Sequence, residues 1–390
     1  MLEQSRAQEP IRIGIIGAGV MGTDHAQLLA SQVRGAVVAG IADADPARSE
    51  QLASAVSAKV FKDGESLIAA PEVDAVIIAS ADHTHHRYTM AALAARKPVL
   101  TEKPLAPTID ECREIVLADM DLDSSAAPQS PNREDKYPRP GLVSVGFMRR
   151  FDPSCAHLRN LVEEETYGRA LLVHCVSRGV SSAAGSSTES AISNSAIHEI
   201  DFVPWLLDSP VTAVTWQAPA ASKHADGLAD PQLFTLETAS GAIASCELFL
   251  NARYGHDVRS EVVFEEGVAS TVEPTLVTVN HAGSSGTTFG PDWRRRWAEA
   301  YRLELQAWVD ALKDDALNAD AANGVSAPSA SETQSSAPDM TIRLQASGLA
   351  SAADGMAAIL VVEALIASHR SGGMRTPVRS VADVLQGSLS

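Results

Sequence analysis

The sequence predicts a doubly wound α/β domain with a parallel sheet, followed by an α+β domain with a large, mostly antiparallel sheet. Three observations support this prediction. Strand and helix patterns alternate through the first hundred residues, a glycine-rich turn joins the first strand to the first helix, and strand patterns separated by turn residues dominate from Arg169 onwards. A chain of 390 residues is long enough for two domains, which we place at 1–146 and 147–390.

The first predicted strand, 11–16, is an apolar run that leads into a turn with G-x-G-x-x-G spacing and then into a helix over 23–31. This order is the context that the dinucleotide-binding fingerprint of the Rossmann fold requires. The first glycine permits the tight turn, the second lets the backbone approach a pyrophosphate, and the third lets the helix sit close to the strand. The turn residues that we expect to bind the cofactor are Gly17, Gly19, Val20, Met21 and Gly22.

The second predicted strand, 36–42, ends at Asp43, about 20 residues after the last glycine of the turn, where the fingerprint places an acidic residue. A carboxylate at this position accepts hydrogen bonds from both ribose hydroxyls and repels a 2′-phosphate. The alternative interpretation of the glycine motif is a tight turn and a helix cap without a cofactor. That interpretation gives no reason for an acid at position 43. The sequence therefore predicts a nicotinamide cofactor site that favours NAD over NADP.

The first domain continues with a β-branched run at 73–80, which is typical of a parallel strand buried on both faces. The elements expected after it are a short helix at 89–95, a strand at 98–101, a helix at 109–119 capped by Thr108, and a closing strand at 142–146. Ligands bind at the carboxyl ends of the strands in such a sheet. The residues at these ends that we expect near the cofactor are Ser80, His83, Glu102 and Lys103.

The second domain has a different pattern, in which several strands alternate between apolar and polar residues. Strands are expected at 171–175, 211–217, 233–237, 243–250, 258–264 and 269–271, and a helix at 195–207. Antiparallel strands with helices on one face are the α+β arrangement. Two long helices, 293–312 and 349–369, can return to pack on the first domain.

Two segments resemble insertions. Residues 121–140 are rich in Ser, Pro, Asp and Asn, and residues 314–339 are dominated by Ala, Ser, Asn and Pro. Neither segment can bury enough apolar surface to offset the entropy lost on ordering it. We expect both to be mobile surface loops; folding in the presence of a partner is the alternative.

Composition excludes several classes of function. A net charge of −18 argues against binding to nucleic acid or to an anionic membrane surface. The four cysteines are widely separated without metal-ligand spacing, so we expect buried free thiols in a reducing compartment. The chain opens with a polar leader rather than a signal peptide, and the apolar stretch 356–367 is too short for a membrane span. We expect a cytoplasmic protein.

Polar residues follow two of the expected parallel strands. Lys103, in the sequence Glu-Lys-Pro, comes directly after the strand at 98–101, and a surface lysine is the alternative interpretation. Three histidines between 83 and 86 follow the strand at 73–80, and a metal site is one interpretation of them. No Cys, Asp or Glu stands at matching spacing elsewhere, so we expect no metal.

These motifs resemble the glucose–fructose oxidoreductase/inositol dehydrogenase family. In the first domain the matching motifs are Gly-Ala-Gly-Val-Met-Gly at 17–22, Asp43, His-Thr-His at 83–85 and Glu-Lys-Pro at 102–104. In the second they are Val-Gly-Phe-Met-Arg-Arg-Phe-Asp at 145–152, Val-His-Cys at 173–175, Ile-His-Glu-Ile-Asp at 197–201 and Asp-Trp-Arg-Arg-Arg at 292–296. The last group is similar to the bacterial myo-inositol 2-dehydrogenase branch. Apart from the two insertions, the resemblance covers nearly the whole chain.

The resemblance implies a mechanism. Lys103 and His198 match the family's lysine and histidine that face the reacting carbinol. Hydride transfer to NAD⁺ leaves a carbonyl, so a base must take the hydroxyl proton, and histidine titrates in the range that suits this role. Lys103 can stabilise the negative charge that develops on the same oxygen. For His198, the alternative is a core histidine on an amphipathic helix.

The chain also departs from the family. Asn194 stands where the family usually has an aspartate four residues before the histidine; an amide can position His198 but cannot raise its pKa by its charge. Ser177 stands where the branch tends to have histidine, and His256 where it tends to have tyrosine. The residues expected near the substrate are Met148, Arg149, Ser177 and Tyr254.

The function implied is NAD-dependent oxidation of a ring hydroxyl of inositol, from myo-inositol to 2-keto-myo-inositol, or of a close cyclitol or polyol. A dehydrogenase of scyllo-inositol or of an aldose is an alternative within the family. A catalytically weak NAD(H)-binding sensor is an alternative of another class, which Lys103 and His198 disfavour and Asn194 favours. The family resemblance further implies a homo-oligomer, commonly a tetramer, formed through the open face of the second sheet.

Overall fold

The computed structural model describes residues 9–124, 141–271, 278–322 and 348–387. The chain divides into two compact units, Met1–Phe147 with Tyr301–Met356, and Met148–Ala300 with Ala357–Ser390. The expected second domain ran unbroken to the C-terminus, whereas residues 301–356 belong to the first unit. Each unit is therefore built from two separate stretches of chain.

The first unit contains a parallel sheet. Its strands are β1 (Ile11–Ile16), β2 (Ala36–Ala42), β3 (Lys59–Val60), β4 (Ala75–Ile78), β5 (Val99–Glu102), β6 (Val143–Gly146) and β15 (Ala350–Ser351). They are ordered β15-β6-β5-β4-β1-β2-β3, and only β15 runs antiparallel to its neighbour. The order of the first six strands is that of the doubly wound dinucleotide-binding fold, as the sequence predicts.

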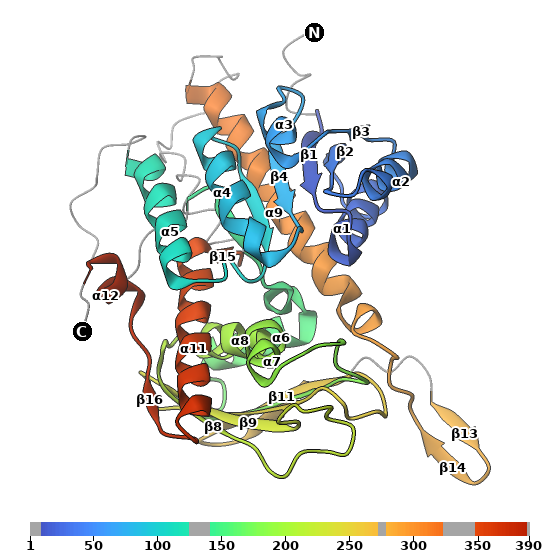
Figure 1. The fold of residues 1–390 in the computed structure, drawn as a ribbon. Helices are drawn as coiled ribbons and strands as arrows, with labels where there is room; N and C mark the ends of the chain where they lie inside the picture. Colours follow the sequence, from blue (N-terminus) through green and yellow to red (C-terminus); the bar gives the residue numbers. More distant parts are fainter. Residues whose placement is uncertain (1–8, 125–140, 272–277, 323–347, 388–390) are drawn as a thin grey trace. The chain divides into compact units, whose positions relative to one another are not determined.

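Helices lie on both faces of this sheet (Figure 1). They are α1 (Val20–Ser31), α2 (Pro46–Val56), α3 (Gly64–Ala69), α4 (His85–Ala94) and α5 (Ile109–Ser124), with a 3₁₀ turn η2 at Asp82–Thr84. α1 packs against α2, and α4 packs against both α3 and α5. α1 begins at Val20, three residues before the expected start at 23, so the second half of the glycine motif is itself helical.

The two expected insertions begin later than the sequence pattern indicates. α5 continues to Ser124, beyond the expected loop start at Asp121, and α9 (Arg294–Ala322) continues beyond the expected start at Asp314. The α9 extension, 314–322, contains four alanines and one leucine, which favour a helix and explain its greater length. The remaining parts of the two segments, 125–140 and 323–339, lie outside the described residues.

The second unit contains a large, mostly antiparallel sheet. Its strands are β7 (Ala170–Arg178), β8 (Val211–Gln217), β9 (Gln232–Thr238), β10 (Ile243–Phe249), β11 (Asp257–Phe264), β12 (Val268–Ser270) and β16 (Thr376–Pro377). They are ordered β12-β11-β7-β10-β9-β8-β16, and only β7 and β10 pair in parallel. A separate hairpin is formed by β13 (Val279–His281) and β14 (Ser284–Gly286).

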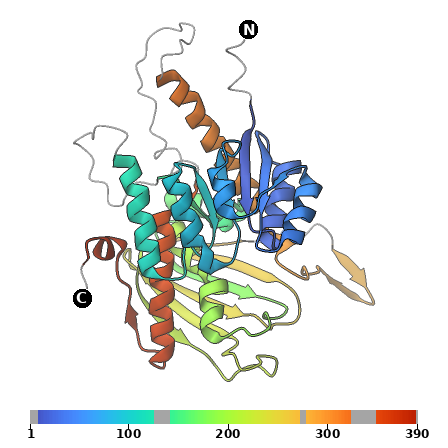
Figure 2. The same cartoon turned by 45° about the horizontal axis from the view of Figure 1, so that its top comes forward.

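One face of this sheet is covered by helices (Figure 1 and Figure 2). The elements are η3 (Met148–Phe151), α6 (Pro153–Glu163), α7 (Thr188–Ala191), a π-helical turn η4 (Ile192–Ala196), α8 (Ile197–Leu207) and α11 (Ala352–Arg370). A short helix, α12 (Val381–Leu385), follows β16. Side chains alternate along β7, where Val173 and Cys175 are buried and Leu172 is exposed. Leu172 pairs in register with Ile243 of β10, which is exposed as well, so the second face is open and partly apolar.

α11 is the one helix in the described parts of the chain that is long and apolar enough to cross a membrane, judged by length and composition. Its most apolar window is 61% buried within the protein. Ser368 donates a hydrogen bond to the carbonyl oxygen of Met374 and accepts one from the backbone N–H of Trp216 in β8. The helix is therefore packed as the core helix of a soluble protein is packed.

Candidate active site

The glycine turn after β1 has the geometry that a dinucleotide requires. Gly17 has a φ of 104°, a left-handed conformation that favours glycine. A Cβ on Gly22 would overlap the carbonyl oxygen of Gly17, so the helix can approach the turn only with glycine there. A Cβ on Gly19 would have no heavy atom within 4 Å, so this part of the turn faces open space. Val20, the first residue of α1, is exposed beside it.

Asp43, directly after β2, lies beside this turn. Its Oδ2 accepts a hydrogen bond from the backbone N–H of Ala18 over 2.6 Å, and its Oδ1 accepts one from the N–H of Asp45 over 2.8 Å. The side chain is half-buried. Each carboxylate oxygen can accept a further hydrogen bond, so Asp43 keeps the capacity to bind ribose hydroxyls. The turn and this acid together fit an adenine dinucleotide.

Ser80 and His83 follow β4 at the same edge of the sheet. The hydroxyl groups of Ser80 and Thr84 are 2.6 Å apart, which fixes the start of the 3₁₀ turn η2. His83 is exposed on that turn. The sheet places both residues at the carboxyl end of β4, next to the end of β1, where ligands bind in this fold.

Glu102, the last residue of β5, is buried and engaged within the protein. His25 of α1 donates a hydrogen bond from Nε2 to Oε1 of Glu102 over 2.7 Å. Burial alone raises the pKa of this carboxyl group, but the hydrogen bond and charge of His25, together with the charges of Lys103 and His85, outweigh burial, and the net pKa of Glu102 lies below its usual value. We expected Glu102 to contact the cofactor; the structure uses its carboxylate to join β5 to α1.

Both neighbours of Lys103 in the chain form hydrogen bonds with buried histidines. Before it, the side chain of Glu102 binds His25. On the other side His85 donates from Nδ1 to the carbonyl oxygen of Pro104 over 2.7 Å, and its Nε2 lies 3.1 Å from the carbonyl oxygen of Ser80. The Lys103–Pro104 peptide bond is cis. These contacts fix the backbone of Lys103 at the carboxyl end of β5.

In the second unit, His198 is the second residue of α8, and Asn194 lies in the π-helical turn before it. A π turn is wider than an α-helical turn, and such turns are frequent at functional sites. We expected Asn194 and His198 to be separated by one ordinary helical turn. The π turn changes that spacing, so the two side chains are not related as neighbours at i and i+4 on a regular α-helix.

Met148 and Arg149, in η3, are both buried. Arg149 donates from Nη1 to Oε1 of Glu199 in α8 over 2.5 Å. We expected Arg149 near the substrate, which stays a prediction; in the structure its Nη1 forms an ion pair with Glu199, the residue after His198. We expected no role for Glu199, although an acid among the apolar residues of a predicted buried helix is a recognisable signal of such a pair.

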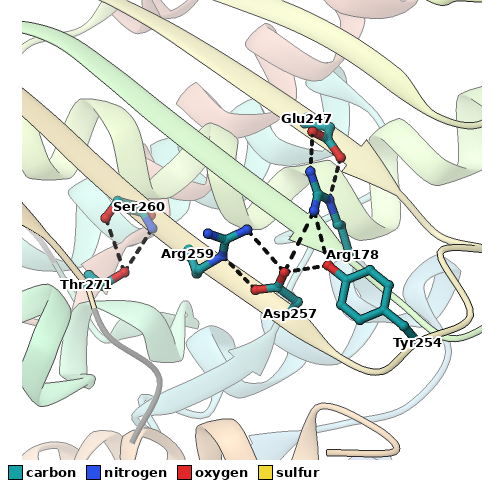
Figure 3. A network of polar contacts seen from close by, with 7 residues as sticks. All are labelled: Arg178, Glu247, Tyr254, Asp257, Arg259, Ser260 and Thr271. Carbon is teal, nitrogen blue, oxygen red and sulfur yellow. Dashed lines mark hydrogen bonds and ion pairs between the residues drawn. The ribbon is translucent and has the colours of Figure 1, made fainter. Parts of the chain in front are cut away.

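Tyr254 belongs to a polar network on the open face of the second sheet (Figure 3). Its hydroxyl donates to Oδ2 of Asp257 over 2.5 Å and accepts from Nη1 of Arg178 over 3.1 Å. Arg178 in turn binds Glu247 through Nε and Nη2, at 2.6 and 2.8 Å. Arg178 and Ser177 are successive residues of β7 and face opposite sides of the sheet. The hydroxyl of Tyr254 and the side chain of Ser177 are therefore not brought to the same face.

His256 precedes β11 and has an unusual environment. Its Nε2 is buried without a hydrogen-bond partner. Burial, followed by the charges of Arg149 and Arg296, lowers the pKa of His256 to about 4. The ring is therefore neutral at physiological pH.

All four cysteines are buried, and none of them forms a disulfide. Within the described ranges, no three His, Cys, Asp or Glu side chains gather in a way that could hold a metal ion.

Comparison with known families matches both units. Residues 11–120 match the model of an oxidoreductase family with an NAD-binding Rossmann fold, and residues 155–270 match the GFO/IDH/MocA C-terminal domain.

Similar proteins of known name and structure span most of the chain. Inositol 2-dehydrogenase 2 of Paenarthrobacter aurescens is 43% identical over 370 residues, which cover 95% of this chain and 99% of that protein. An inositol 2-dehydrogenase/D-chiro-inositol 3-dehydrogenase of Shouchella clausii is 40% identical over 78% of this chain and 85% of that protein. The crystal structure of myo-inositol dehydrogenase from Lactobacillus casei in complex with NAD(H) and myo-inositol is 27% identical with a TM-score of 0.79, covering 95% and 98% of the two chains.

Proposed function

The chain belongs to the GFO/IDH/MocA family and is an NAD-dependent oxidoreductase of the inositol dehydrogenase type, and from this premise we propose that it oxidises a ring hydroxyl of myo-inositol to give 2-keto-myo-inositol. The observation that carries the proposal is the 43% identity to an inositol 2-dehydrogenase over 95% of the chain. The open space at Gly19 and the fixed carboxylate of Asp43 support the choice of cofactor.

NAD⁺, when bound, accepts the hydride from the carbon that carries the reacting hydroxyl. The chain must then take up the hydroxyl proton and stabilise the oxygen while the C–H bond breaks. We assign the first task to His198 as general base. We assign the second to Lys103, whose ammonium group offers a positive charge to the developing oxyanion. The products are the ketone, NADH and one proton, which His198 passes to solvent.

The other site residues divide into contacts and supports. We propose that Met148 and Ser177 contact the cyclitol and that Ser80 and His83 contact the cofactor. Arg149, Glu102 and Tyr254 each form a hydrogen bond with a protein partner, so we assign them a supporting role. We propose that Asn194 either forms a hydrogen bond with a substrate hydroxyl or orients His198.

D-chiro-inositol is a second candidate substrate, because a relative that is 40% identical carries both activities in its name. Oxidation of scyllo-inositol or of an aldose is the further alternative within the family, and a weak NAD(H)-binding sensor is the alternative outside catalysis. The test is NADH formation, followed at 340 nm, with each inositol isomer and a set of common aldoses. A sensor would bind NADH yet reduce no NAD⁺ with any polyol.

We further propose that the enzyme acts in the cytoplasm as a homotetramer in inositol catabolism. The open face of the second sheet, with exposed Leu172, Leu233 and Ile243, supports association of copies through this face. Light scattering coupled to size exclusion tests it: a tetramer is expected, and a monomer at micromolar concentration would contradict the assembly.

A further inference from the structure

We propose that Arg149 and Arg150 are positioning residues that fix the rotation of α8 and thereby the direction of His198. The two arginines bind Glu199 and Asp201, the acids one and three residues after that histidine; we call these four residues the arginine clamp. The proposal rests on the proposed function only in the role given to His198.

The contacts of the arginine clamp are short and buried. Arg149 donates from Nη1 to Glu199 over 2.5 Å, and the two side chains are 6% and 1% exposed. Arg150 donates from Nε and Nη2 to the two carboxylate oxygens of Asp201, at 3.1 and 2.5 Å. Breaking one partner of a buried ion pair leaves an uncompensated charge, so such pairs strongly favour the arrangement that keeps both partners together.

The helical positions of the two acids explain how they control rotation. With 3.6 residues per turn, Glu199 lies about 100° from His198 on one side, and Asp201 lies about 60° from it on the other. His198 is therefore directed between the two anchored acids. Turning α8 in either direction lengthens one of the two ion pairs.

Contacts from other elements must fix the orientation of α8, because its own series of backbone hydrogen bonds is interrupted. The π turn Ile192–Ala196 precedes it, and Pro204 lies inside it. Proline lacks the N–H that would bond four residues back, and both features cause kinks in helices. The residues between these two interruptions, which include His198, are the ones that the arginine clamp holds.

A second layer of contacts supports the arginines. The guanidinium groups of Arg149 and Arg296 lie 5.1 and 4.0 Å from the centre of the Trp297 ring. Arg296 donates from Nη1 to Asp152 over 2.6 Å, and Asp152 caps the N-terminus of α6 by accepting from the N–H groups of Ser154 and Cys155. The arginine side of the clamp is thus tied to α6 and to Trp297.

The test compares Arg149→Lys and Arg150→Lys with Arg375→Lys, a matched control in the same unit. Arg375 binds Glu237 through two hydrogen bonds of 2.8 Å, but this pair is largely exposed and joins the segment between α11 and β16 to β9. For each variant we would measure kcat per NADH-binding site, KM for NAD⁺, and hydrogen exchange of the amides of α8. Counting NADH-binding sites removes the effect of any unfolded fraction.

Both clamp variants should lose about tenfold to a hundredfold in kcat, since a displacement near 1 Å can cost this much. Their KM for NAD⁺ should stay within about twofold, because the glycine turn and Asp43 belong to the first unit, while the amides of α8 exchange faster. The control should match the wild type. Clamp variants that keep kcat per binding site within twofold of the wild type, or that leave exchange of α8 unchanged, would overturn the proposal.

Asp201→Asn and Glu199→Gln provide the same comparison from the acid side if an arginine variant does not fold, since they keep the shape and remove the charge. A wild-type enzyme that oxidises no polyol would contradict the proposed function but not the arginine clamp. In that case hydrogen exchange of α8, faster in the clamp variants than in the control, would still support the clamp, and equal exchange would refute it.

Discussion

Asp43 accepts a hydrogen bond from the backbone N–H of Ala18 over 2.6 Å, so the acidic end of β2 is tied to the middle of the glycine turn. We propose two tasks for this one carboxylate: it holds the turn in the shape that receives a pyrophosphate, and its charge faces the adenosine ribose of the bound cofactor. The two tasks can be separated by substitution, because asparagine keeps an acceptor oxygen and loses the charge.

The wild type should prefer NAD⁺ over NADP⁺ by about tenfold or more in kcat/KM, because a 2′-phosphate would meet the carboxylate at close range. Asp43→Asn should narrow this preference with a small rise in KM for NAD⁺. Asp43→Ser should narrow it too and raise KM further, because the shorter side chain no longer reaches the N–H of Ala18. Steady-state rates with both cofactors check this. Equal use of the two cofactors by the wild type would contradict the role of Asp43.

Lys103→Ala and His198→Ala should each fold and bind NADH, yet lose about 10²–10⁴ in kcat, the usual range for positioned acid–base groups. Lys59→Ala is the matched control, because Lys59 forms an exposed pair with Glu72 in the same unit as Lys103. NADH fluorescence titration and steady-state kinetics give both quantities. If His198→Ala instead unfolds at room temperature while its folded fraction binds NADH normally, His198 is a core residue rather than the base.

Asn194→Asp should raise the pKa of a neighbouring imidazole, since a carboxylate stabilises its protonated form. If position 194 assists the base, the acid limb of the kcat/KM profile should move to higher pH in the variant. If position 194 reads a substrate hydroxyl, the ranking of inositol isomers should change while the limb stays in place. A variant that changes neither the limb nor the ranking would remove Asn194 from the site.

His256 should make stability depend on pH. Its pKa is about 4 in the folded protein and near 6.5 in the unfolded chain, so the unfolded state binds more protons between these values. The contribution of His256 to stability is complete above pH 6.5 and is lost as the pH falls towards 4. Urea unfolding at several pH values should show that the free energy of unfolding falls less between pH 6.5 and 4 in His256→Gln than in the wild type. If this free energy depends on pH identically in the two proteins, the ring is protonated in the folded state over this range as it is in the unfolded chain.

The fold was largely predictable because strongly apolar, regular segments determine it. β1, β2 and β8 have the bounds expected from their hydrophobic runs, and the glycine spacing correctly indicated the parallel sheet. α2 and α6 were not predicted, because their apolar faces are narrow. Each nevertheless begins with an aspartate cap followed by proline at the first helical position, a signal that could have located them.

The site was less predictable because its contacts join residues far apart in the sequence. Arg149 was expected at the substrate, yet its partner Glu199 lies 50 residues away. Glu102 was expected at the cofactor, and His25, 77 residues before it, engages its carboxylate. A motif shows which residue types a position carries, but only the packed structure shows which of their polar atoms are already used.

Transfer of deuterium from ring carbon 2 of myo-inositol to NAD⁺ is the most direct test of the central claim that this chain oxidises a cyclitol carbinol. The enzyme would be incubated with NAD⁺ and myo-inositol deuterated at that carbon, and the reduced cofactor and the ketone analysed by mass spectrometry. The account predicts one deuterium in each reduced cofactor and an equal amount of 2-keto-myo-inositol. Reduced cofactor without deuterium, or no reduced cofactor from an enzyme that binds NADH, would contradict it.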